Sequence, residues 1–265
     1  MLGAIAGDII GSIYERDNIK TKAFPLFQDH CSYTDDTVCT LAVAHALLEE
    51  KEFAATLRDF ARRYPGRGYG ARFLDWARSD SPRGNGSWGN GAVMRVSPVG
   101  YVARNEDEVL DLAARSAAAS HDHPDAVAAA QAAALTIWLT RNGMAPGALR
   151  AEIAGRFGYN LSLSVDQIRP SHDYDFSARG TLPVALICAL EGRDYEDAVR
   201  NAISLGGDSD TLACIAGSFA EVLYGLPEQI AQKALEHLDD EQRALVARFS
   251  AKHQVSSGGR PESAG

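Results

Sequence analysis

Two short segments place carboxylates beside hydroxyl groups at the start of an apolar run. They are YTDDT (33–37) and GGDSDT (206–211). One acid at a helix start is explained by N-capping, because a carboxylate there accepts hydrogen bonds from free backbone amides. A second acid against apolar residues costs several kcal/mol unless it is paired. No Lys or Arg lies within four residues of either acidic pair, so a divalent cation is the natural partner.

If the two helix starts face each other, six oxygen-bearing side chains surround one point. These side chains are Thr34, Asp35, Asp36, Asp208, Asp210 and Thr211. Mg²⁺ and Mn²⁺ prefer such oxygen ligands, and four carboxylates match the charge of two divalent ions. We therefore predict a binuclear metal site between two helix N-termini. Capping combined with pairing to remote residues is the alternative.

A further acidic pair lies in the N-terminal segment AGDIIGSIYER. Asp8 and Glu15 are seven residues apart, which places them on one face of a predicted apolar helix. Glu15 then either orients or deprotonates a water molecule at the metals, or lies in solvent beside Arg16. Asp35 or Asp36 could also serve as the base. The residues alone leave these alternatives open.

The remaining pattern is helical. Apolar residues recur at helical spacing in nine further segments, 35–50, 52–64, 107–120, 125–141, 147–157, 182–192, 195–205, 210–225 and 240–250. No alternating strand and no hairpin signal is present in the sequence. We predict an all-α fold, a single compact helical bundle over residues 1–254, followed by a disordered polar tail at 255–265.

Two glycine-rich segments, 64–73 and 81–95, separate predicted helices. Such loops expose backbone amides that can bind a diphosphate, and Tyr69 and Trp88 add flat aromatic surfaces. Simple chain reversal is the alternative for either loop taken alone. Together they favour a nucleotide-like ligand.

Several motifs occur in an order that resembles the ADP-ribosylglycohydrolase family, from about residue 3 to about residue 225. The motifs are AGDIIGSIYE, YTDDT, RGYGA, GSWGNGAVMRVSPVG, SHDHPDA and LGGDSDTLA. The resemblance implies an all-α fold around two Mg²⁺ or Mn²⁺ ions. It also implies hydrolysis of the glycosidic bond between ADP-ribose and an acceptor, which is a modified protein side chain or a small ADP-ribosyl compound.

The resemblance also assigns roles to individual residues. It makes Thr34, Asp35 and Asp36 one metal triad and Asp208, Asp210 and Thr211 the other, and it links Glu15 to catalysis. The substrate contacts that it implies are Gly68, Gly70, Gly86, Ser87, Trp88, Asn90 and His121.

Two other functions fit parts of the sequence. One is a catalytically silent module that binds ADP-ribose. The other is a metal-dependent phosphohydrolase of the His-Asp all-α type, suggested by the adjacent His121 and Asp122. The phosphohydrolase would need a further histidine, for which His30 and His45 are available, and would leave both acidic motifs without a role.

The composition restricts the kinds of partner and the compartment that we expect for this protein. The net charge is −9 with scattered basic residues, which argues against an extended nucleic-acid surface. No apolar run approaches the length of about 18 residues that a membrane span requires. The four cysteines lack the spacing of a metal knuckle, which suits a reducing compartment. We expect a cytoplasmic monomer.

Overall fold

A computed structural model describes residues 1–79, 81 and 84–253 of the protein. These residues form fifteen helices and no strand; two short segments pair only through an isolated antiparallel bridge between Gly89 and Ser177. The helices are α1 (Leu2–Gly11), α2 (Asp35–Leu48), α3 (Phe53–Arg63), α4 (Ala71–Arg78), α5 (Gly91–Met94), α6 (Val99–Val102), α7 (Glu106–Ala118), α8 (Pro124–Arg141), α9 (Pro146–Phe157), α10 (Val165–Ile168), α11 (Ala178–Leu190), α12 (Tyr195–Ile203), α13 (Ser209–Tyr224), α14 (Glu228–Glu236) and α15 (Asp240–His253).

The all-α prediction is confirmed, and each of the nine predicted segments overlaps a helix. Two amphipathic helices were not foreseen. α4 overlaps the first predicted glycine-rich loop and buries Phe73 and Trp76, and α14 buries Ile230 and Ala234. The predicted tail, 255–265, lies outside the described residues, so the domain boundary at 254 stays a prediction.

Helices α1 and α13 form the centre of the fold because glycines let their backbones touch. A Cβ atom at Gly7 would lie 2.1 Å from the carbonyl oxygen of Ala213, and one at Gly3 would lie 2.6 Å from that of Gly217. Only glycine permits this approach. The contact brings the end of α1 beside the start of α13, where the second acidic motif lies.

One local prediction was wrong. Asp8 and Glu15 do not share a helical face, because α1 ends at Gly11 and Glu15 lies in the turns that follow. A Cβ atom at Gly11 would lie 2.6 Å from the Cα atom of Asp210, so the end of α1 is packed against the first turn of α13.

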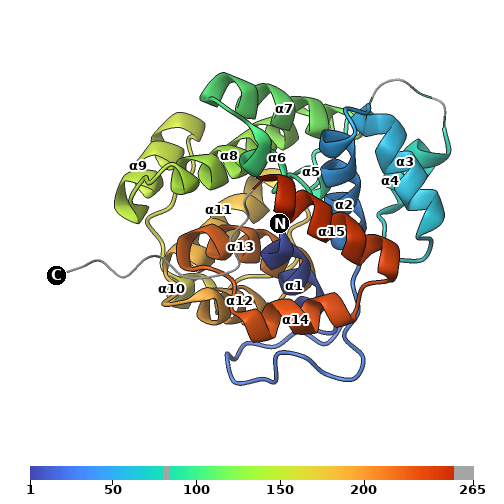
Figure 1. The fold of residues 1–265 in the computed structure, drawn as a ribbon. Coiled ribbons are helices and arrows are strands. Elements are labelled where there is room, and N and C mark those ends of the chain that lie inside the picture. The colour runs from blue at the N-terminus through green and yellow to red at the C-terminus, as the bar shows by residue number, and fades with distance from the viewer. Residues whose placement is uncertain (80, 82–83, 254–265) are drawn as a thin grey trace.

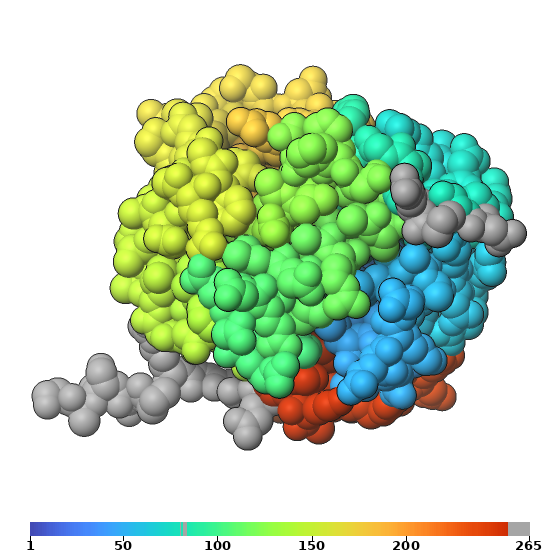
Figure 2. Space-filling model, turned by 90° about the horizontal axis from the view of Figure 1, so that it is seen from above, coloured from blue at the N-terminus to red at the C-terminus, as the bar shows by residue number. Residues whose placement is uncertain are grey.

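The other helices surround this central pair (Figure 1). α7 and α8 lie above it, α14 lies below it, and α3 and α4 flank it beside α2. The view from above shows α7 and α8 in green over that face, between α9 in yellow and the blue residues of α2 and α3 (Figure 2). No helix in the described residues combines the length and apolar character that crossing a bilayer requires. All four cysteines are buried free thiols.

Candidate active site

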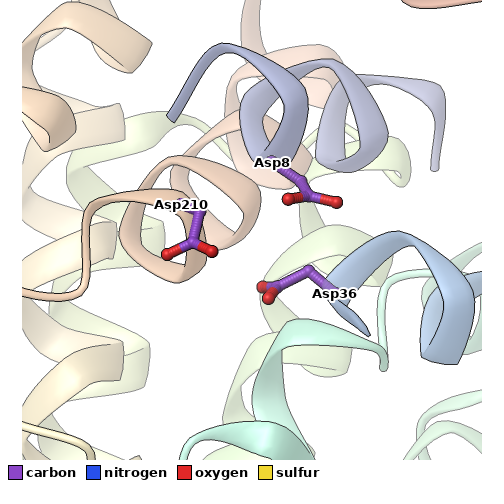
Figure 3. A group of neighbouring side chains, drawn as sticks. All are labelled: Asp8, Asp36 and Asp210. Carbon is purple, nitrogen blue, oxygen red and sulfur yellow. The ribbon is translucent and has the colours of Figure 1, made fainter. Parts of the chain in front are cut away.

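Three buried aspartates from three different helices converge at the centre of the molecule (Figure 3). Asp8 comes from α1, Asp36 from α2 and Asp210 from α13, and one carboxylate oxygen of each lies within 4.8 Å of the others. A second group, Glu15, Asp208 and Asp210, meets the same distance limit. The fold therefore brings the two acidic helix starts together, and it adds both acids of the N-terminal segment.

Asp8 organises the start of α2. Its Oδ2 atom accepts hydrogen bonds from the backbone N–H groups of Thr34, at 3.0 Å, and Thr37, at 3.1 Å. Its Oδ1 atom accepts from the Thr34 hydroxyl at 2.8 Å, and the Thr37 hydroxyl donates to Oδ2. Burial nevertheless outweighs these bonds and raises the pKa of Asp8 to about 6. Asp8 thus satisfies free donors of the first turn of α2.

Asp36 and Asp210 have a different environment. The Oδ1 atom of each is buried and has no hydrogen-bond partner among the described residues. The Oδ2 atom of Asp36 accepts from the Thr211 hydroxyl at 3.3 Å and lies 3.2 Å from the Thr34 hydroxyl, whose single hydrogen has its shorter contact with Asp8. In the described part of the chain, neither acid forms an ion pair with a Lys, Arg or His. These carboxylate oxygens without hydrogen-bond partners, with hydroxyls beside them, are suitable ligands for hard divalent cations.

The pKa values of these acids agree with a site that fits a divalent cation. Burial, and then the neighbouring carboxylates, raise the pKa of Asp35 to about 8 and hold the pKa values of Asp36 and Asp210 well above their ordinary range. Burial also raises the pKa of Asp208, and burial followed by the charge of Asp208 raises that of Glu15. Mutual repulsion of this kind is relieved by a bound cation.

Two glycine-rich segments adjoin these acids. Gly68 has a positive φ of 96°, and a Cβ atom there would lie 3.3 Å from Oδ1 of Asp35. Asn90, predicted to contact substrate, donates its side-chain amide to Oδ2 of Asp208 at 2.7 Å. Asn90 therefore orients the Asp208 carboxylate, and it also borders the cavity beside the acids.

A cavity of about 360 Å³ opens beside the acids. The predicted residues that border it are Glu15, Thr34, Asp35, Asp36, Gly68, Gly70, Ser87, Trp88, Asn90, His121, Asp208, Asp210 and Thr211. Gly86 is not among its lining residues. The N–H group of Gly86 instead donates to Oδ1 of Asp122 at 2.6 Å, so Gly86 helps to anchor the loop that carries Trp88.

His121 is buried and uncharged at neutral pH. Burial, and then the charge of Arg95, hold its pKa well below the ordinary range, and its Nδ1 atom lies 2.8 Å from the Ser120 hydroxyl. A Cβ atom at Gly91 would lie 2.9 Å from its Nε2 atom, so the absence of a side chain there makes room for the ring. His123 instead caps α8 by accepting from the N–H group of Asp125.

Two aromatic side chains form a rim at the mouth of the cavity: Trp88, which was predicted from the sequence, and Phe176, which was not. Phe176 borders the cavity with 53% of its surface exposed, and Trp88 borders it with 48% exposed. The N–H group of Asn90 donates to the Phe176 carbonyl at 2.8 Å, and that of Ala178 donates to the Trp88 carbonyl at 2.9 Å. The signal was the pair of aromatics in the polar stretch DYDF, where Tyr174 stacks on Phe176 with ring centroids 5.5 Å apart.

Acids and glycine-rich loops thus line one cavity. The sequence profile of the ADP-ribosylglycohydrolase family matches residues 1–258. The chain belongs to this family. ADP-ribosylhydrolase ARH3 of Danio rerio is 25% identical over an alignment of 328 positions, which covers 92% of this chain and 88% of that protein. The Homo sapiens ARH3 is 24% identical, with coverage of 86% and 85%.

A solved structure gives the same result in three dimensions. The structure of an ADP-ribosylglycohydrolase-related protein complex matches with a TM-score of 0.72 and 27% identity, over 94% of this chain and 96% of that chain. The family resemblance is confirmed, and the protein is an ADP-ribosyl glycohydrolase. The family is metal-dependent, and the acidic groups of this chain could hold a metal ion. The silent binding module and the phosphohydrolase are thereby set aside.

Proposed function

We propose that this ADP-ribosyl glycohydrolase is a metal-dependent hydrolase that releases ADP-ribose from a modified protein side chain or from a small ADP-ribosyl compound. The observation that carries the proposal is the pair of buried, unpartnered oxygens on Asp36 and Asp210, beside a cavity that the glycine-rich loops also line. An uncompensated pair of this kind is costly unless a ligand binds it.

The residues that would hold two Mg²⁺ or Mn²⁺ ions are Thr34, Asp35, Asp36, Asp208, Asp210 and Thr211. Hydroxyl and carboxylate oxygens are suitable ligands for both metals. When bound, such ions supply positive charge that can grip the ribose hydroxyls and lower the pKa of a water molecule. Asp8 would support them indirectly by fixing the first turn of α2.

Glu15 is the proposed general base. It borders the cavity, and one of its oxygens lies within 4.8 Å of oxygens of Asp208 and Asp210. Cleavage at the anomeric carbon passes through an oxocarbenium-like state. The Glu15 carboxylate would orient the attacking water and accept its proton as the acceptor leaves. Asp35 and Asp36 are the alternative bases, since both also border the cavity.

The nucleotide would lie against the glycine-rich loops that line the cavity. Backbone amides of the loops around Gly68, Gly70 and Ser87 can bind a diphosphate, and the exposed face of Trp88 can stack on a flat ring. His121, as a neutral ring, can exchange a hydrogen bond with the ligand without adding charge. Gly86 contributes by holding this loop to Asp122.

The decisive experiment measures ADP-ribose release from a mixed pool of ADP-ribosylated proteins and small ADP-ribosyl compounds. Parallel reactions contain Mg²⁺, Mn²⁺ or EDTA. Release that requires a metal supports the proposal, and the modified group that disappears identifies the acceptor. Release that is equally fast in EDTA after exhaustive dialysis would contradict the metal assignment. We also propose a cytoplasmic monomer, which fractionation and sedimentation would test.

A further inference from the structure

The side-chain amide of Asn18 joins the turn that carries Glu15 to the loop that carries Asp208. The two hydrogens of its Nδ2 group are shared among three carbonyl oxygens, which lie 2.7 Å (Tyr14), 2.9 Å (Glu15) and 3.1 Å (Gly207) from Nδ2. Its Oδ1 atom accepts from the N–H group of Gly207 at 2.6 Å. One side chain thus holds two main-chain segments that are separated by almost two hundred residues, 189 from Asn18 to Gly207.

The loop before Asp208 is shaped to meet this amide. Gly206 and Gly207 have φ values of 68° and 73°, a conformation that other residues rarely adopt. A Cβ atom at Gly206 would lie 3.1 Å from Oδ1 of Asn18, and one at Gly207 would lie 2.9 Å from the carbonyl oxygen of Asp173. The two glycines therefore allow the loop to lie against Asn18 and against residues 172–176, the segment that leads to Phe176 of the rim.

Further hydrogen bonds tie the rim to the same point. The Tyr174 hydroxyl donates to the carbonyl of Glu15 and lies 3.4 Å from Nδ2 of Asn18. Lys20 donates to the carbonyl of His172 at 2.6 Å and to that of Leu205. Asn18 is itself solvent-exposed, so its contacts add little apolar burial. Their effect is to fix the relative position of Glu15, the Asp208 loop and the rim.

We propose that Asn18 is a positioning residue that holds the Glu15 carboxylate in register with the acids of Asp208 and Asp210. The inference rests on the proposed function, because the role of Glu15 is assigned there. Asn18 acts on Glu15 through its backbone and not through the substrate. A displacement of about 1 Å at a reacting group can cost about a hundredfold in rate.

A double-mutant cycle between Asn18→Ala and Glu15→Gln tests this coupling, with two separate measurements. The first is the Kd of Mn²⁺ in the absence of substrate, measured by calorimetry. The second is kcat and KM for ADP-ribose release. We expect Asn18→Ala to weaken Mn²⁺ binding about 3- to 10-fold and to lower kcat about 10- to 100-fold, with KM changed by less than about threefold. In the Glu15→Gln background at saturating Mn²⁺, it should cause no further loss of kcat, whereas the weaker Mn²⁺ binding should persist, because Asn18 also holds the loop that carries Asp208.

Two variants serve as controls. Asn142→Ala removes another exposed asparagine, whose Nδ2 donates to the Trp138 carbonyl at 2.8 Å, and it should leave both measurements unchanged. Asn18→Asp keeps the acceptor for the Gly207 N–H group but lacks the donors to the three carbonyls. It should therefore be at least as defective as Asn18→Ala.

The outcomes separate the two proposals. Additive losses of kcat in the cycle, or an Asn18→Ala protein with unchanged Mn²⁺ affinity and kcat, would overturn the positioning role while leaving the proposed function intact. If the wild-type protein releases no ADP-ribose with either metal, but Asn18→Ala still weakens Mn²⁺ binding, the positioning role is supported and the proposed function is rejected. If Asn18→Ala lowers only the unfolding temperature and leaves Mn²⁺ affinity and kcat unchanged, the positioning role is also overturned.

Discussion

The Thr211 hydroxyl on α13 lies 3.3 Å from Oδ2 of Asp36 on α2, and it donates a hydrogen bond to that carboxylate. This bond joins the two acidic motifs directly, although 175 residues separate its partners in the chain. It leaves Oδ1 of Asp36 without a hydrogen-bond partner among the described residues.

Replacing Asp210 with Asn should separate metal binding from folding. Turnover should fall by at least about 100-fold, since changes to groups that only support a ligand already cost about 10- to 100-fold. The metal-free variant should be as stable as the wild type or more stable by about 1–2 kcal/mol, because a buried acid that repels its neighbours is removed. Thermal unfolding with and without Mn²⁺ measures both effects. Full activity in metal-limited buffer would contradict the site assignment.

The stability of the metal-free protein should depend on pH. The folded state raises the pKa of Asp8 to about 6 and that of Asp35 to about 8, so the folded protein binds more protons than the unfolded chain between these values and the ordinary carboxyl range. This contribution is complete below the unfolded pKa; the part from Asp8 is lost as the pH rises to about 6, and the part from Asp35 as the pH rises to about 8. The unfolding temperature in EDTA should therefore fall over this interval.

Saturating Mn²⁺ should reduce that fall, because the cation stabilises the ionised acids. The difference between the unfolding temperatures with Mn²⁺ and with EDTA should accordingly widen from pH 6 to pH 8. A difference that stays constant across this interval would argue that the acids do not bind the ion.

Asp8→Ala should destabilise the fold. The change leaves the N–H groups of Thr34 and Thr37 and their hydroxyls without the acceptor that they share, at a cost of about 2–4 kcal/mol. Urea denaturation in EDTA measures the free energy of unfolding. The matched control is Asp111→Ala, since Asp111 only forms an exposed ion pair with Arg115 at 3.6 Å, and it should change stability by less than about 0.5 kcal/mol. Equal effects in both variants would show that Asp8 is not an anchor of α2.

Trp88→Ala should loosen the nucleotide with little effect on folding, because 48% of the Trp88 surface is exposed. Stacking on a base is worth about 1–3 kcal/mol, which corresponds to an increase of about 5- to 150-fold in the Kd of ADP-ribose. Calorimetric titration with ADP-ribose gives this value, and Trp88→Phe should retain most of the affinity. Leu163→Ala, at another exposed apolar position outside the cavity lining, is the control. Unchanged affinity in Trp88→Ala would place the flat ring elsewhere.

Much of the fold could be predicted from the sequence, because helical periodicity and N-capping residues act over a few positions. The segments 35–50 and 210–225 begin and end within two residues of α2 and α13. α4 was missed because its first turn overlaps the glycine-rich segment 64–73, which was interpreted as a loop, and α14 was missed although it is as long as α12, which was predicted. The acidic pairs were likewise visible as charges that local neighbours could not neutralise.

By itself, the sequence determined the all-α class, the starts of the two acidic helices α2 and α13, and the residue types of the acidic centre. The order of its motifs also indicated the family. Only the tertiary structure decided that α1 ends at Gly11 and that Asp8 anchors α2. It also decided that Asn90 bonds the Asp208 carboxylate and that Asn18 bonds the backbone of Gly207. The physical reason is that local spacing fixes dihedral preferences. The partner of a buried polar atom is fixed by packing between distant segments, such as the backbone contact of Gly7 with Ala213 that brings α1 against α13.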